Sequence, residues 1–187
     1  MNAQNNITSV EELFEWKPAK VQSWLDSVWA RRQGLPAAFN WLLLAQHAAQ
    51  LARWNDDLDW ARVSTRVYDW LHRVDLDGYD ESSMTLRAYF INKHGAVIGD
   101  SLLDPGVILK WFYESLSIGF SEAEVDIETC NELIAKGKIQ DPGVFQRCRN
   151  LRSIKNKLSI IALLVESKSI RPDEDLSRWL DIRTKLP

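Results

Sequence analysis

The residue types that most often catalyse reactions or bind metals are few in this sequence, and their spacing favours neither role. The three histidines (His47, His72 and His94) lie far apart, without the His-Glu-x-x-His spacing that places two zinc ligands on one helix face. Cys130 and Cys148 do not make a zinc site or a disulfide framework. Both fall on predicted apolar faces, where a thiol behaves as a small hydrophobic group. We therefore predict no catalytic residue, no metal site and no cofactor.

The segment from Trp54 to Trp60 combines aromatic and acidic side chains that could bind another protein. Three carboxylates, those of Asp56, Asp57 and Asp59, lie between its two tryptophans, at the expected tip of a helical hairpin. Exposed together, these residues would resemble an interface hot spot whose charges attract a basic partner. In the alternative interpretation, the acids cap the following helix and complement its dipole, while both rings point inward. The sequence leaves both interpretations open.

Basic residues gather in one segment, which offers an alternative site for nucleic acid. The candidate residues are Arg149, Arg152, Lys155 and Lys157, with Arg147 beside them. On a helix these side chains spread around the axis instead of forming one stripe. The preceding segment is acidic, and folding back would bring Glu132 near Arg147 or Arg149, and Glu128 near Arg152. We therefore favour internal charge pairing over nucleic-acid binding.

Helices must position these candidate sites, because apolar residues recur at helical spacing through most of the chain. The longest such run covers about residues 142–169 and predicts one helix of some six turns. One helix cannot bury its apolar stripe alone, so other helices must pack against it. The stripe consists of Val144, Cys148, Leu151, Ile154, Leu158, Ile161 and Val165.

Capping residues, prolines and glycines divide the rest of the chain into further helices. The expected ranges are 9–16, 18–32, 36–54, 57–74, 82–93, 104–118, 121–136 and 173–185. A short linker makes 36–54 and 57–74 an antiparallel hairpin, and 95–103 could be a short strand or a buried loop. The predicted fold class is all-α. It is a single-domain bundle of eight or nine helices, with hairpins packed around the long C-terminal helix. Residues 1–8 are expected to be frayed and residues 9–187 to form the domain.

The composition is that of an ordinary globular protein, with 45% hydrophobic and 26% charged residues. A net charge of −3 is too small to indicate a polyanion partner. Seven of the nine tryptophans lie in the first seventy residues. They predict core and inter-helix packing. In the alternative interpretation, one or two of them are exposed as interface anchors. The most apolar run, Leu158–Val165, is far shorter than the roughly 20 residues of a membrane span. Without a signal peptide, a cytoplasmic location is expected.

These features favour a non-enzymatic protein-binding module. The predicted class is a bacterial inhibitor or immunity-type protein that neutralises one partner by occlusion, such as a basic toxin or effector. The predicted partner-binding residues are Trp54, Asp56, Asp57, Asp59 and Trp60. One alternative is a nucleic-acid-associated helical subunit that uses the basic cluster. Another is an enzyme whose carboxylate site is assembled across helices, which a single sequence does not exclude.

Overall fold

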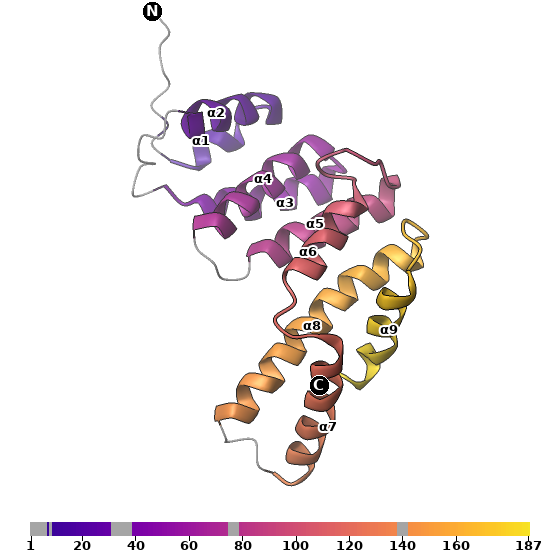
Figure 1. Cartoon of the computed structure of the whole chain (residues 1–187). Helices are drawn as coiled ribbons and strands as arrows, with labels where there is room; N and C mark the ends of the chain where they lie inside the picture. Colours follow the sequence, from indigo (N-terminus) through magenta and orange to yellow (C-terminus); the bar gives the residue numbers. More distant parts are fainter. Residues whose placement is uncertain (1–6, 8, 31–38, 75–78, 138–141) are drawn as a thin grey trace, which may run out of the picture. The chain divides into compact units, whose positions relative to one another are not determined.

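The computed structural model describes residues 7, 9–30, 39–74, 79–137 and 142–187, and it is helical throughout (Figure 1). These residues form nine α-helices and one short 3-10 helix, without a strand, so the all-α prediction is confirmed. The chain divides into two compact units, Met1–Arg87 (unit 1) and Ala88–Pro187 (unit 2). The boundary falls within α5 (Tyr79–His94). The single domain over 9–187 stays a prediction. Of the segment 1–8 only Ile7 is described, and it is buried.

Unit 1 is built on a hairpin of two helices, α3 and α4. Its helices are α1 (Glu11–Phe14), α2 (Pro18–Ala30), α3 (Trp41–Asn55) and α4 (Leu58–Val74), followed by the first part of α5. The helix pairs α3–α4 and α2–α4 pack against each other. The Ser64 hydroxyl on α4 donates a buried hydrogen bond of 2.7 Å to the Ala45 carbonyl on α3. Buried alanines on α3, such as Ala48 and Ala52, allow this close approach.

Helix α3 begins at Trp41, which is later than the sequence indicated. Asn40 is its N-cap, and the Asn40 side chain accepts a hydrogen bond of 2.9 Å from the Leu43 amide. The predicted start at Pro36 is wrong, because Phe39 and Asn40 already lie outside the helix. Asn40 sets the boundary, because its side chain satisfies a free amide of the first turn. Pro36 itself lies outside the described residues.

Four tryptophans of unit 1 form one aromatic cluster. Ring centroids lie 5.7 Å apart for Trp24 and Trp41, 5.2 Å for Trp41 and Trp70, and 6.3 Å for Trp29 and Trp70. These separations are typical of packed aromatic pairs. The prediction of inter-helix packing is therefore confirmed for these four tryptophans.

Unit 2 is organised around the long helix α8 (Pro142–Glu166). Its other elements are α6 (Pro105–Glu114), α7 (Phe120–Ala135), α9 (Glu174–Ile182) and the 3-10 helix η1 (Arg183–Lys185), and all four pack against α8. The predicted unbroken helix is confirmed. Its 25 residues span about 37 Å. It ends three residues earlier than predicted because Lys168 is left-handed (φ 60°), and the Ser169 amide donates back to Leu164.

The buried surface of α8 is wider than the predicted stripe. Leu151, Ile154, Leu158 and Ile161 of that stripe are buried, whereas Cys148 and Val165 are only half-buried. Ile160, Ala162 and Leu164 are buried as well, so the second half of the helix is covered on more sides. No helix in the described part of the chain combines the length and apolarity needed to cross a membrane.

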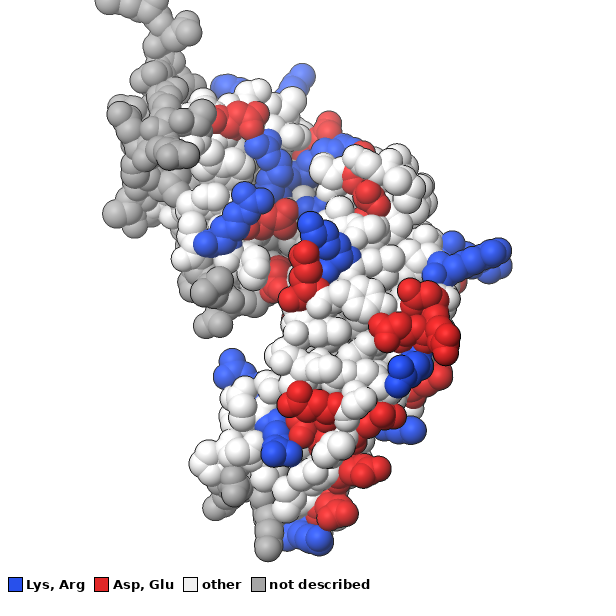
Figure 2. All heavy atoms as spheres, in the orientation of Figure 1, with Lys and Arg blue, Asp and Glu red and all other residues white. Residues whose placement is uncertain are grey.

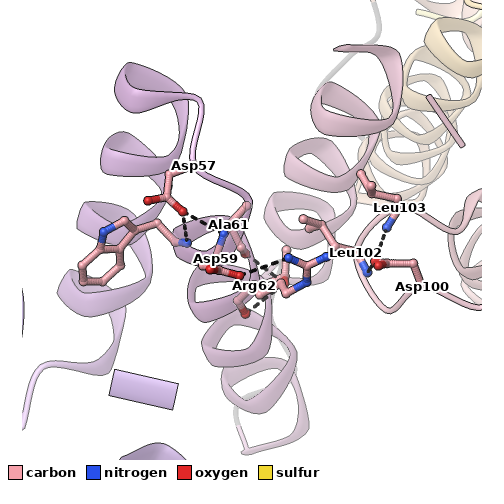
Figure 3. Close-up of polar contacts among 9 residues, drawn as sticks. Asp57, Asp59, Ala61, Arg62, Asp100, Leu102 and Leu103 are labelled. Carbon is pink, nitrogen blue, oxygen red and sulfur yellow. Dashed lines mark hydrogen bonds and ion pairs between the residues drawn. The ribbon is translucent and has the colours of Figure 1, made fainter. Parts of the chain in front are cut away.

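The segment 95–103 is a loop, so the strand alternative is wrong, and the buried-loop alternative holds only at Leu102 and Leu103. Val97 and Ile98 are 48% and 80% exposed. The segment turns at Gly95 and Gly99, whose φ angles of 90° and 85° suit glycine. The Asp100 carboxylate accepts hydrogen bonds from the amides of Leu102 (2.7 Å) and Leu103 (3.0 Å), as Figure 3 shows. Hydrogen bonds from side chains and backbone within the loop thus stabilise this segment, and it does not need the hydrogen bonds of a neighbouring strand.

Candidate functional site

The tip of the α3–α4 hairpin is fixed by its own acidic residues. Asp56 ends α3 in the left-handed conformation, with φ 54°. The Asp57 carboxylate accepts hydrogen bonds from the amides of Asp59 (2.8 Å) and Trp60 (3.1 Å), as Figure 3 shows for the start of α4. Asp57 is therefore the N-cap of α4, and its carboxylate is already used within the chain.

The two tryptophans that flank this tip lie in opposite environments. Trp54 is 75% exposed, whereas Trp60 is 6% exposed and belongs to the core of unit 1. Neither interpretation of the segment holds in full, because the rings are neither exposed together nor buried together. Asp56 is exposed. The Asp59 side chain is 59% exposed and pairs with Arg62 at 3.2 Å. The surface available to a partner consists of Trp54, Asp56 and Asp59. Asp57 caps α4 beneath this surface, and Trp60 packs in the core of unit 1.

Loss of the Asp57 cap should loosen this tip. Asp57→Ala is expected to lower the free energy of unfolding by about 1 kcal/mol, because two amides of the first turn of α4 lose their acceptor. Asp57→Asn is the matched control, since its side-chain oxygen can still accept a hydrogen bond, and its effect should be a few tenths of a kcal/mol. Urea unfolding followed by circular dichroism measures both. Equal losses for the two variants would contradict the capping role.

The basic cluster does not form a single free surface. Lys157 is buried and donates to the Ser115 carbonyl at 2.7 Å, and Lys155 donates to the Leu186 carbonyl at 2.9 Å. Both lysines therefore tie α8 to neighbouring segments of unit 2. Arg149 and Arg152 are exposed. Of the four residues predicted to bind nucleic acid, Arg149 and Arg152 therefore lie on the surface. The amines of Lys155 and Lys157 are engaged in hydrogen bonds within unit 2.

Internal charge pairing involves different partners from those predicted. Arg147 pairs with Asp126 at 2.9 Å, and the Asp126 side chain is only 7% exposed. Glu132, the expected partner of Arg147 or Arg149, pairs with Lys136 at 3.3 Å. In the lower part of Figure 2, acidic side chains follow the edge where α7 lies, with basic ones scattered among them. Mixed charge of this kind does not favour phosphate binding.

Two cavities lined by described residues could bind a ligand, and they lie in different units. The cavity in unit 1, of about 650 Å³, lies among α3, α4 and α5, and its lining includes Arg53, Tyr68 and Glu81. Burial raises the pKa of the Tyr68 hydroxyl, and the charge of Arg53 opposes this shift. Glu81 is the one carboxylate among its described lining residues. The described residues also contain no group of three His, Cys, Asp or Glu side chains that could hold a metal ion.

The cavity in unit 2 is smaller and more apolar, with a volume of about 290 Å³. Its lining combines Ile134 of α7 with Phe145, Cys148, Arg149 and Arg152 of α8. Phe145 is 62% exposed, so an open apolar surface lies beside two arginines.

Sequence analysis missed the contact between the two cysteines. The sulfur atoms of Cys130 on α7 and Cys148 on α8 lie 2.9 Å apart. The sequence could have predicted this contact. Cys130 and Cys148 are equally far along the chain from residue 139, the middle of the expected turn between the two helices. Antiparallel helices bring such positions opposite each other.

Comparisons with protein-family models, with curated proteins and with solved structures gave no match in any of the three. The function is therefore inferred from the chain's own surface.

Proposed function

We propose that this protein is a non-enzymatic protein-binding module whose main anchor is Trp54. The observation that carries the proposal is the 75% exposure of this ring on a capped helical hairpin. Tryptophan is enriched among the few residues that supply most of the binding energy of protein interfaces. An anchor on a fixed backbone also loses little conformational freedom on binding.

The acidic residues beside Trp54 define the kind of partner. Asp56 is exposed next to the ring, and Asp59 is mostly exposed although it is paired with Arg62. Exposed charges at the rim of an interface mainly speed association and select partners of opposite charge. We therefore infer a basic protein partner. Among non-enzymatic protein-binding modules, we favour a bacterial inhibitor of the immunity type, which neutralises a toxin or effector by covering its surface.

Trp54→Ala should abolish capture of the partner without unfolding the chain. Truncation of an anchor tryptophan costs about 2 kcal/mol of binding free energy or more, which weakens binding by about 30-fold. Proteins captured from an extract of the source cells are identified by mass spectrometry, and the affinity of the recovered partner is then measured by calorimetry. The thermal melting curve should match that of the wild type, because the ring is exposed.

Ile98→Ala is the matched control for this experiment. Ile98 is 80% exposed in the loop before α6, so the variant also removes an exposed apolar side chain. The proposal requires a basic protein that is retained by the wild type and by Ile98→Ala but lost by Trp54→Ala. If every captured protein binds all three equally, Trp54 is not an anchor. Co-expression then tests inhibition: the wild type, but not Trp54→Ala, should relieve the growth arrest caused by the partner.

A further inference from the structure

The cysteines of unit 2 are placed to form a bond with little rearrangement. Their sulfur atoms are 2.9 Å apart, against about 2.05 Å in a disulfide, so they need to approach by only about 1 Å. Both belong to helices that pack directly against each other, α7 and α8. A pair of apolar thiols needs no such contact to fill a core, so the arrangement suggests a chemical role.

The two thiols differ in their access to solvent. Cys130 is completely buried, whereas Cys148 is half-buried and lines the 290 Å³ cavity of unit 2. A reagent that enters the cavity therefore meets Cys148 first and finds Cys130 directly behind it. Burial raises the pKa of the Cys130 thiol to about 12, so this sulfur reacts more slowly with outside reagents than an exposed thiol does.

The cavity also favours a particular kind of oxidant. Arg149 and Arg152 are exposed at its lining, next to the apolar surfaces of Ile134 and Phe145. Two guanidinium groups attract carboxylates. A disulfide that carries carboxylates matches the charge of this cavity, and its disulfide group can approach Cys148 from the open side.

We propose that Cys148 is a modification site for low-molecular-weight, carboxylate-bearing disulfides, and that Cys130 resolves the adduct into an intramolecular disulfide. The Cys148 thiolate attacks one sulfur of the small disulfide, forms a mixed disulfide and releases the first small thiolate, which takes up the proton that Cys148 lost. The sulfur of Cys130 then attacks the Cys148 sulfur, its proton passes to the second leaving thiolate, and the protein disulfide closes. The two protein thiols are oxidised by two electrons, and one small disulfide is reduced to two small thiols.

The product would cross-link α7 to α8 and make unit 2 harder to unfold. The bond closes a loop between residues 130 and 148, and a loop of this length restricts the unfolded chain appreciably. The oxidised protein should melt about 5 °C or more above the reduced protein.

The test uses the full chain and glutathione disulfide as the probe, with products trapped by acid and alkylation and identified by mass spectrometry. The wild type should lose both thiols, gain no glutathione and yield a peptide cross-linked between Cys130 and Cys148. Cys130→Ser should accumulate one glutathione on Cys148, and Cys148→Ser should hardly react. The proposal is overturned if the wild type keeps a glutathione on Cys148 with Cys130 free, or if the native chain stays unmodified while the denatured chain reacts. Should either serine variant fail to fold by circular dichroism, the wild-type product alone decides.

A second arm tests the role of charge. The double variant Arg149→Gln, Arg152→Gln should react with glutathione disulfide at least about threefold more slowly, because the attraction of the two arginines for carboxylates is lost. Its rate with the uncharged 2-hydroxyethyl disulfide should change little. Equal slowing with both reagents, or no slowing with either, would refute the preference for carboxylates.

Discussion

Leu158→Ala is expected to lower the free energy of unfolding by about 3 kcal/mol. Leu158 lies in the second half of α8, is completely buried and belongs to the stripe against which unit 2 packs. Its replacement removes three carbon atoms from the core and leaves a cavity that the surrounding helices fill only in part. Urea unfolding monitored by far-ultraviolet circular dichroism gives the value. If the two units unfold in separate transitions, the loss should appear in the transition of unit 2.

Leu163→Ala provides a control on the same helix. It removes the same atoms, but Leu163 is 40% exposed, so its loss should cost less than about 1 kcal/mol. The contrast between the two positions depends only on the face of α8 that each occupies. Similar losses at both positions would show that α8 does not have the buried face described here.

Asp69→Ala should cost about 3 kcal/mol as well, for an electrostatic reason. The Arg87 side chain is only 6% exposed, and its guanidinium lies 2.7 Å from the Asp69 carboxylate. Ser83 also donates to Asp69, at 2.6 Å. Without the carboxylate, a buried cation loses its ion pair, and Ser83 loses its acceptor. Because Asp69 is itself one-third exposed, water can replace part of the lost interaction, which places the expected cost at the lower end for a broken buried pair.

The double variant Asp69→Ala, Arg87→Met separates the buried charge from the lost contact. Methionine keeps much of the apolar stem of arginine and carries no charge, so the double variant should be at least about 1 kcal/mol more stable than Asp69→Ala alone. Thermal and urea unfolding of the single and double variants complete the cycle. If the two substitutions simply add, the unpaired charge is not the source of the instability.

Most helices could be predicted because their apolar spacing is local and repeats over several turns. The run that became α8 is the clearest example. Boundaries were less predictable where two signals competed, as with Pro36 and Asn40 at the start of α3. The burial of residues 95–103 was predicted poorly, because the apolar residues Val97 and Ile98 are exposed. Their residue types therefore do not indicate whether they are buried.

The candidate site could be located in the sequence but not oriented correctly. Trp60 continues into the buried positions Val63 and Val67, which indicates the inner face of α4. Trp54 lies two residues after the buried Ala52, which places it about 200° around the helix, away from the core. Helical geometry therefore indicates that Trp60 faces the core and that Trp54 faces away from it. The pairings Asp69–Arg87 and Asp126–Arg147 were not predictable in the same way, because they depend on how separate helices pack.

The most direct test of the proposed function is the rate of oxidative labelling of Trp54, measured with and without the partner recovered by Trp54-dependent capture. In the free chain, Trp54 should be labelled faster than the buried Trp60, in line with exposures of 75% and 6%. In the complex, labelling of Trp54 should fall sharply. Labelling of Trp54 at the same rate in the complex as in the free chain would contradict the proposal that this ring is the anchor.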